Sequence, residues 1–392
     1  MDSETNIEQG KFQTAGVILA STAHGMHDTY TGFLPALLPL LIQKFSLTNT
    51  TAGLLSFFMR LPSLLQPLIG QLADRANLRM LVILAPTFTG IAMSMLGIAP
   101  TYGVLVFLLV LAGLSSASLH AVGPAIMSRL AGNKLGKGVS FWMVGGELGR
   151  SLGPVIVVTV ISYLTLERLP WLMLAGVFIS IFLYIKFKSL AIQPTRNGNG
   201  ANWKIIFHKM RGVMVPLTFV LFTRTLMAAT LTVFLPTLLT NEGSSLMMAG
   251  ASLTILQVAG VMGTLLAGPL SDRYGRRGIL VISYIATPVF MFLFLQSKGL
   301  WQIPFLVLTG FFGISVTPVV MAMVLENFPD NRSLANGIYM AVAFLLNSLG
   351  ILLAGKLGDL LGLRYTFLLS IGLIPLGLPF IYFLPKSKRL RN

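Results

Sequence analysis

Long apolar stretches recur along the whole chain and constrain its fold more than any other feature of the sequence. Of the 392 residues, 55% are hydrophobic and 10% are charged, whereas a soluble globular protein carries about 25% charged residues. A water-soluble core cannot bury this much apolar surface, but a helix of about 20 apolar residues crosses a hydrocarbon layer about 30 Å thick. The sequence predicts twelve membrane-spanning helices, at 14–43, 51–73, 80–99, 102–129, 138–164, 170–188, 213–240, 248–270, 279–297, 301–325, 333–355 and 364–384.

A polar, glycine-rich segment at 192–200 separates the sixth stretch from the seventh. Clusters of Gly, Asn, Thr and Pro mark loops between regular elements. The sequence therefore predicts an N-terminal six-helix bundle at 1–190, a cytoplasmic linker at 191–212 and a C-terminal six-helix bundle at 213–392.

The two halves also share sequence motifs. FLPALL at 33–38 recurs as FLPTLL at 234–239, and GQLADR at 70–75 recurs as GPLSDR at 268–273. The spacing between the members of each pair is similar, as expected of an internal duplication. Two parallel repeats with a binding site near the midplane between them are a transporter architecture.

The second of these loops, GPLSDRYGRR at 268–277, resembles the signature loop of the major facilitator superfamily. The first half is also similar to the fosmidomycin-resistance branch of its efflux pumps. That similarity rests on His24 and Asp28, on LLQPLIG at 64–70, on Ser115-Ser116 with His120, and on GGELGRSLGP at 145–154. The resemblance implies the major facilitator fold, an all-α membrane protein of 12 transmembrane helices in two pseudo-symmetric six-helix bundles. It also implies transport by alternating access, with helices one, two, five and seven facing a central cavity.

Lysine and arginine are unevenly distributed between the predicted loops. If both termini are cytoplasmic, 20 of the 28 lie on the cytoplasmic side, five lie outside and three lie within spans. This asymmetry follows the positive-inside rule. It accounts for the net charge of +16 without a nucleic-acid partner and predicts a bacterial inner (plasma) membrane protein with both termini cytoplasmic. The chain has no cysteine, which excludes disulfides and thiolate metal sites.

The first apolar stretch carries two histidines and a carboxylate, His24, His27 and Asp28. Ionisable side chains within the bilayer cost a few kcal/mol and usually face a cavity or a partner. His24 and Asp28 lie one helical turn apart and therefore on one face, and histidine titrates near neutral pH. We therefore expect Asp28 to exchange the coupling proton, with Glu147, His24 and His27 contributing.

Three arginines lie inside predicted spans, at Arg60, Arg150 and Arg224. At a rise of 1.5 Å per residue they lie about 13 to 18 Å into their helices, as Glu147 and His24 do. An arginine offers a two-pronged fork to carboxylate or phosphonate, so this surplus of positive charge favours an anionic or zwitterionic substrate. The predicted substrate-binding residues are Arg60, Arg150, Arg224, His120 and Trp142.

The same charges also fit a purely structural interpretation. Ion pairs such as Asp28–Arg60 or Glu147–Arg150 would lock helices together without contacting substrate. His120, which the sequence places deeper toward the cytoplasm, would then be a hydrogen-bonded core histidine. The glycines at 145, 146, 149 and 153 form a small-residue face together with Pro154, which we expect to pack at the interface between the halves.

The duplicated loops are predicted to gate the cytoplasmic side. Their acids can accept hydrogen bonds from helix N-termini, and their arginines can pair across the halves when the inner gate closes, or they can serve only as positive-inside anchors. The predicted gating residues are Asp74, Arg75, Arg79, Asp272, Arg273, Arg276 and Arg277.

The sequence contains neither the Gly-Lys-Ser/Thr loop of ATP-driven transporters nor a His-Glu-x-x-His metal motif. It therefore predicts a secondary transporter without cofactors rather than an enzyme, and we expect this transporter to be a monomer. The partial likeness of GRSLGP at 149–154 to an antiporter signature favours a proton-coupled exporter of a drug or small organic anion. The alternatives are a proton-coupled uptake symporter or a uniporter for an anionic metabolite, and a sensor that does not transport.

Overall fold

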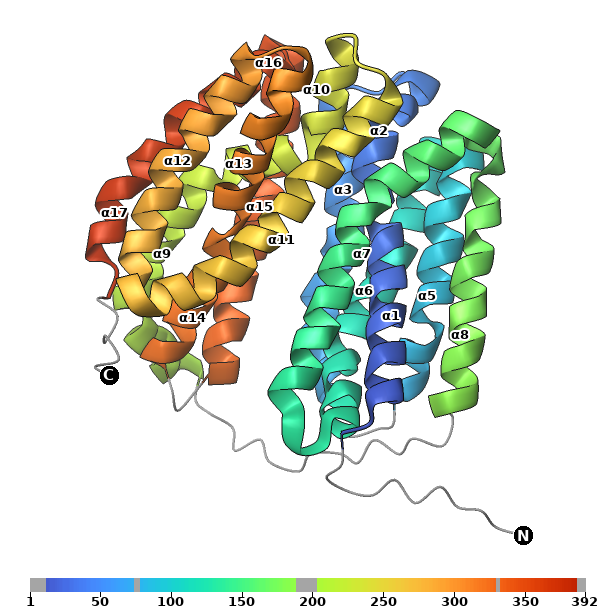
Figure 1. Ribbon diagram of the computed structural model, residues 1–392, viewed down its shortest axis with the longest axis horizontal. Helices are drawn as coiled ribbons and strands as arrows, with labels where there is room; N and C mark the ends of the chain where they lie inside the picture. Colours follow the sequence, from blue (N-terminus) through green and yellow to red (C-terminus); the bar gives the residue numbers. More distant parts are fainter. Residues whose placement is uncertain (1–11, 74–77, 188–202, 329–331, 386–392) are drawn as a thin grey trace. The chain divides into compact units, whose positions relative to one another are not determined.

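The computed structural model of the protein describes residues 12–73, 78–187, 203–328 and 332–385 (Figure 1). Every regular element within these ranges is a helix. Eleven of the helical segments are long and apolar enough to cross a membrane. The predicted all-α membrane fold is therefore confirmed.

The helices before the linker include the segments that hold the candidate site. They are α1 (Thr14–Thr31), α2 (Phe33–Phe45), α3 (Asn49–Arg60), α4 (Gln66–Ala73), α5 (Arg79–Ser94), α6 (Tyr102–Ala131), α7 (Leu135–Leu164) and α8 (Met173–Phe187). The predicted first span, 14–43, is present as α1 and α2 with a break at Gly32. The polar residues of α1 lower its hydropathy, so this span is not among the eleven.

The helices after the linker form the second half. They are α9 (Trp203–Ala229), α10 (Leu235–Asn241), α11 (Leu246–Tyr274), α12 (Arg276–Gln296), α13 (Gln302–Ile314), α14 (Val316–Asn327), α15 (Arg332–Leu361), α16 (Leu363–Leu373) and α17 (Leu378–Phe383). A π-helical segment, Thr230–Phe234, joins α9 to α10.

The chain divides into two compact units. The first comprises the described residues of Met1–Phe33, Phe58–Gly153 and Tyr163–Arg196, and the second those of Leu34–Phe57, Pro154–Ser162 and Asn197–Asn392. The segments 34–57 and 154–162 precede the predicted linker but belong to the second unit. At these two segments the units differ from the predicted bundles. The bundle boundaries drawn from the sequence stay a prediction.

Hydrogen bonds within the second unit explain this grouping. Asp359 of α15 accepts hydrogen bonds from the backbone N–H groups of Asn49 and Thr50, at 2.6 and 3.0 Å, at the start of α3. The backbone N–H of Val155 in α7 donates to Thr254 Oγ1 of α11 at 3.2 Å. A carboxylate at a helix N-terminus satisfies donors that have no partner within the helix, so Asp359 ties α3 to α15.

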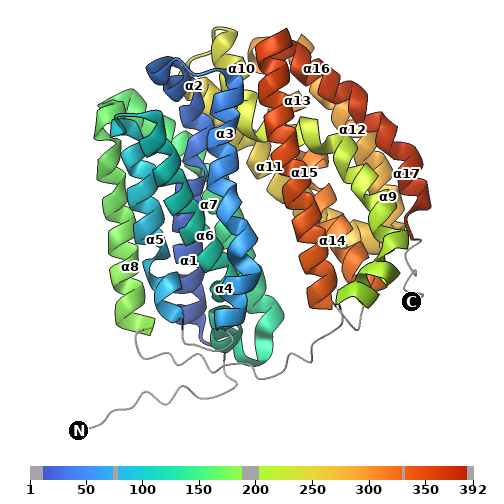
Figure 2. The ribbon, with the colours of Figure 1, turned by 180° about the vertical axis from the view of Figure 1, so that it is seen from behind.

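In the first unit, α1 packs among α5, α6 and α8, which Figures 1 and 2 show side by side. One apolar cluster joins these helices to α7. Its buried members include Val17, Ala20 and Ala23 of α1, Val82 and Ile83 of α5, Leu119, Val122 and Ile126 of α6, Trp142 of α7 and Leu183 of α8. The cluster holds the polar face of α1 against α6 and α7.

The glycine face of α7 packs against α1. A Cβ atom at Gly149 would overlap the carbonyl oxygen of Gly25, and one at Gly145 would overlap that of Ser21. At Gly146 a Cβ would overlap the His24 ring. The expectation that these glycines lie between the halves is therefore wrong: the atoms nearest to them belong to α1 in the first unit. The absence of side chains lets the two backbones approach closely, which brings α7 within reach of the ionisable residues of α1.

Replacing Gly149 with alanine is expected to lower thermal stability and transport together, because the added methyl group collides with backbone that cannot move aside. Ala normally stabilises a helix relative to Gly by about 1 kcal/mol. A lower melting temperature of the Gly149 variant would therefore show that the collision outweighs this gain. Gly372→Ala is the matched control, since a Cβ there meets nothing within 4 Å. Thermal unfolding in detergent would measure both variants. Equal behaviour of the two would contradict the close approach of α7 and α1.

Candidate functional site

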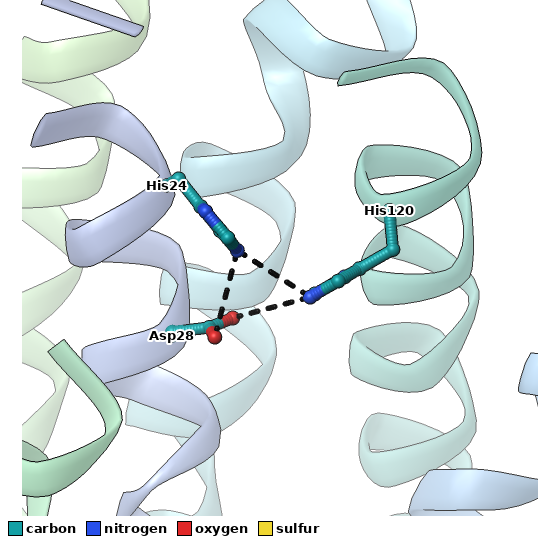
Figure 3. Close-up of side chains that lie close together, drawn as sticks. All are labelled: His24, Asp28 and His120. Atoms are coloured by element: carbon teal, nitrogen blue, oxygen red, sulfur yellow. Dashed lines mark hydrogen bonds and ion pairs between the residues drawn. The ribbon is translucent and has the colours of Figure 1, made fainter. Parts of the chain in front are cut away.

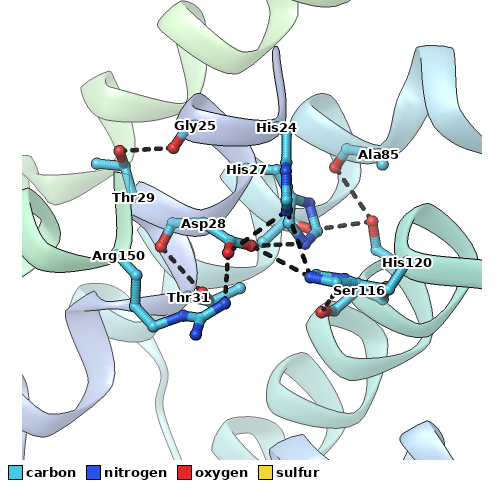
Figure 4. Close-up of polar contacts among 12 residues, drawn as sticks. His24, Gly25, His27, Asp28, Thr29, Thr31, Ala85, Ser116, His120 and Arg150 are labelled. Atoms are coloured by element: carbon cyan, nitrogen blue, oxygen red, sulfur yellow. Dashed lines mark hydrogen bonds and ion pairs between the residues drawn. The ribbon is translucent and has the colours of Figure 1, made fainter. Parts of the chain in front are cut away.

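Three imidazoles surround one buried carboxylate. Asp28 is 1% exposed, and His24 Nε2 lies 3.6 Å from Asp28 Oδ2 (Figure 3). His27 Nε2 and His120 Nε2 each lie 3.9 Å from Asp28 Oδ1 (Figure 4). Helix α1 supplies two of the histidines from adjacent turns, and α6 supplies the third. His120 therefore lies beside Asp28 and not deeper toward the cytoplasm, because α6 packs directly against α1.

Arg150 of α7 forms an ion pair with the same carboxylate. Its Nη2 lies 2.6 Å from Asp28 Oδ2, and its Nη1 lies 3.3 Å from Glu147 Oε1. The arginine side chain is 43% exposed and that of Glu147 38%, whereas that of Asp28 is 1% exposed. Arg150 thus lies between a buried acid and an accessible one. Of the two structural pairs weighed from the sequence, Glu147–Arg150 is present, and the partner of Asp28 is Arg150 rather than Arg60.

Backbone and hydroxyl oxygens orient the three imidazoles. His24 Nδ1 lies 2.9 Å from the carbonyl oxygen of Trp142, and the Trp142 ring stacks on the His24 ring at 4.1 Å between centroids. His120 Nδ1 lies 2.9 Å from the carbonyl oxygen of Ser116. Because a carbonyl oxygen only accepts hydrogen bonds, each of these Nδ1 atoms carries the proton.

A hydroxyl chain orients His27 in the same way. Ser115 Oγ donates to the carbonyl oxygen of Ala85, and Thr89 Oγ1 donates to Ser115 Oγ at 2.8 Å. Thr89 Oγ1 lies 3.0 Å from His27 Nδ1 and is left to accept from it. Sequence reasoning did not find Thr89. The available signal was a hydroxyl residue next to Gly90, within the apolar run that becomes α5.

The remaining predicted substrate residues lie in different surroundings. Trp142 is 4% exposed and packs on His24, so it positions the histidine. Arg60, at the end of α3, is exposed. Arg224 of α9 donates a hydrogen bond to the carbonyl oxygen of Gly313 and belongs to the second unit. Within the first unit the structure thus joins six of the predicted residues, His24, His27, Asp28, His120, Glu147 and Arg150.

Comparison with known proteins establishes the family. The model of the Major Facilitator Superfamily matches residues 17–262 and 217–392. The chain belongs to the major facilitator superfamily. The resemblance seen in the sequence is thereby confirmed, and the protein is an integral membrane transporter of this superfamily.

Individual members match over nearly the full length of this major facilitator chain. It is 24% identical to the "Fosmidomycin resistance protein" of Escherichia coli (strain K12) over 94% of this chain and 92% of that protein. It is 25% identical to the "Uncharacterized MFS-type transporter YfnC" of Bacillus subtilis (strain 168), over 96% and 94%. A bacterial homologue of the human lysosomal transporter Spinster, in its inward-facing and occupied conformation, superposes with a TM-score of 0.79 at 14% identity, covering 95% and 97%. This last match shows the fold alone.

The structure describes the second copy of the superfamily's signature loop, at 268–277. Arg276, 6% exposed, lies 2.5 Å from Asp272 and 2.6 Å from Glu326 of α14, and its Nη1 donates to Ser271 Oγ. Sequence reasoning did not find Glu326. Arg276 thus pairs within the second unit, and pairing across the halves stays a prediction.

The other predicted gating residues have separate surroundings. Arg273 lies over the Tyr274 ring, and Arg277 lies over the Tyr382 ring. Arg79 begins α5. Asp74 and Arg75 lie outside the residues that the structure describes.

Proposed function

We propose that this major facilitator transporter is a proton-coupled exporter of a drug or small organic anion of the inner membrane, with both termini cytoplasmic, and works as a monomer. The observation that carries the anionic substrate and the proton coupling is the ion pair of Asp28 with Arg150, in which the acid is buried and the arginine is 43% exposed. An anionic substrate reaches Arg150 without reaching Asp28. It therefore competes with Asp28 for the guanidinium.

This competition supplies a coupling mechanism. When Arg150 turns to a substrate carboxylate or phosphonate, Asp28 loses its strongest cationic partner, and a buried carboxylate without a partner favours its protonated form. When the proton leaves, Asp28 recovers Arg150 and releases the substrate. In this cycle the proton on Asp28 and the anion on Arg150 favour each other's binding, which is the coupling of the symport alternative, so the ion pair by itself does not choose the direction of transport.

The neighbouring groups support this cycle. His24 and His27 carry protons to and from Asp28, and Glu147 holds Arg150 while Asp28 is protonated. Arg60 and Arg224 add positive charge for substrate from their own helices, and His120 contacts substrate from its partly exposed position. Asp272, Arg273, Arg276 and Arg277, with Asp74, Arg75 and Arg79, gate the cytoplasmic side.

The direction of transport is inferred from the relatives. The Escherichia coli relative is named for fosmidomycin resistance, and export is the simplest way in which a transporter confers resistance. The partial antiporter motif at 149–154 agrees with this direction. Fosmidomycin, an anionic phosphonate, is therefore the first compound to test.

The test uses inside-out membrane vesicles, which accumulate what the cell would export. An acid-inside pH gradient is imposed, a lumenal pH dye is followed, and fosmidomycin, a dicarboxylate and the cationic dye ethidium are added in turn. We expect the anions to raise the lumenal pH as they enter, and vesicles without the transporter to show no response. Acidification of the lumen on adding substrate would show uptake symport instead. Substrate counterflow without proton movement would show a uniporter.

A further inference from the structure

We propose that His24, Asp28 and His120 form a binding site for a divalent transition-metal cation of the zinc type, with His27 as a fourth available donor. One ligand atom from each of the first three residues lies within 4.8 Å of the others (Figure 3). The inference rests on the donor atoms of the site and not on the proposed direction or coupling of transport.

The first observation is that electron-pair donors face one another. With Nδ1 of His24 and His120 donating to carbonyl oxygens, both Nε2 atoms present lone pairs, and they lie 3.4 Å apart. His27 Nε2 presents a third lone pair, because its Nδ1 is bound to Thr89. All three point to a carboxylate, which in its charged form has no proton to donate. Such an arrangement offers its lone pairs to a cation.

The second observation is that two of these atoms are buried without a hydrogen bond. No described residue donates to Asp28 Oδ1 or accepts from or donates to His27 Nε2, and both atoms are shielded from solvent. Most buried polar atoms have a hydrogen-bond partner. The two atoms lie 3.9 Å from each other.

The distances favour a metal ion over a shared proton. Hydrogen bonds of nitrogen and oxygen span about 2.7 to 3.2 Å, and the separations here are 3.4, 3.6 and 3.9 Å. A tetrahedral zinc ion with bonds of about 2.0 to 2.1 Å holds its ligand atoms about 3.3 to 3.5 Å apart. The two Nε2 atoms already have this spacing, and one oxygen of Asp28 moves closer to complete the shell, since the three ligand atoms lie within 4.8 Å of one another.

The surroundings also have the features of a metal site. Metal-binding histidines commonly donate their other ring N–H to a carbonyl oxygen, a carboxylate or water, as His24 and His120 do here. Imidazole and carboxylate ligands suit zinc, cobalt and nickel, whereas Mg²⁺ and Ca²⁺ prefer oxygen ligands alone. The His120 side chain is 30% exposed, which leaves an approach to the site from solvent.

Arg150 is the one group that opposes a bound cation. It holds Asp28 Oδ2 at 2.6 Å, while Glu147 lies 3.3 Å from its other terminal nitrogen. Arg150 therefore leaves Asp28 for Glu147 without losing an acidic partner, and Asp28 becomes free to bind the metal ion.

The experiment titrates the purified transporter, carrying an affinity tag without histidine, with Co²⁺ and then with Zn²⁺. The chain has four histidines and no cysteine, so background binding is low. We expect one Co²⁺ per protein with the visible absorption bands of tetrahedral cobalt, displacement by one Zn²⁺, and no displacement by excess Mg²⁺. Absence of stoichiometric binding, or an octahedral spectrum unaffected by Zn²⁺, would overturn the proposal.

Single substitutions identify the side chains that bind the metal ion. His120→Ala and His24→Ala are expected to weaken Co²⁺ affinity by at least about 100-fold, with His27→Ala giving a smaller loss. His208→Ala replaces the remaining histidine and is expected to bind as the wild type. Elution volume and thermal unfolding without metal confirm folding, and the partly exposed position of His120 makes its variant the safest. Unchanged binding in folded His120→Ala would overturn the assignment.

Discussion

Transport by an Asp28→Asn variant is expected to run only to equal concentrations on the two sides of the membrane, whatever pH gradient is imposed. Asparagine keeps the size of the side chain but cannot exchange a proton. Asp28 lies against Arg150 at 2.6 Å and within 3.9 Å of three histidines. In the variant these histidines have no carboxylate to which they can pass a proton. Substrate exchange in counterflow needs no net proton movement and is expected to persist.

The measurement compares gradient-driven uptake of fosmidomycin into inside-out vesicles with counterflow in the same preparation. Breaking a buried ion pair costs about 3 to 5 kcal/mol. The cost here is expected to be smaller, because Arg150 is 43% exposed and retains Glu147. Thermal unfolding checks that the variant is folded. Glu147→Gln is the matched comparison, and driven uptake that survives in Asp28→Asn but not in Glu147→Gln would assign the coupling role to Glu147.

Replacing Arg150 with alanine is expected to raise the KM for anionic substrates in counterflow by about 10- to 100-fold, the effect of losing a charge-assisted hydrogen bond worth about 1.5 to 3 kcal/mol. A neutral or cationic substrate does not use the guanidinium, so its KM is expected to change little. The variant also removes the partner of Asp28, and this loss would disturb proton-driven transport through the coupling and not through substrate binding. Counterflow needs no net proton movement, so it measures substrate binding alone.

Arg150→Lys separates charge from geometry. Lysine keeps the positive charge but lacks the planar fork that binds two oxygens at once. It is therefore expected to bind a phosphonate with an affinity between those of the wild type and the alanine variant. An equal loss for fosmidomycin and ethidium in Arg150→Ala would show that Arg150 has only a structural role.

The sequence alone predicted the fold and most of the candidate residues for local reasons. Apolar length fixed the spans, because a helix in lipid must satisfy its backbone internally. Helical spacing placed His24 with Asp28 and Arg150 with Glu147, because residues three or four apart share a face. Both pairs are present at 3.6 and 3.3 Å.

The contacts between helices could not be read in the same way. The sequence gives depth along a helix only within several residues, which is why His120 was placed too deep. It cannot show which backbone carbonyl will face a histidine, so the bond from His24 to Trp142 and the role of Thr89 went unpredicted. Glu326 was missed for the same reason, since its partner Arg276 lies on another helix.

The sequence by itself determined that this protein is a membrane-embedded major facilitator transporter with ionisable groups inside its first, second, fifth and seventh spans. Only the tertiary structure decided that Arg150 binds Asp28 and that three imidazoles present their Nε2 atoms to the same acid. The reason is the packing of α7 on α1, where Gly145, Gly146 and Gly149 leave room for Ser21, His24 and Gly25. Periodicity specifies neighbours on one helix, whereas partners on different helices depend on where two surfaces fit together.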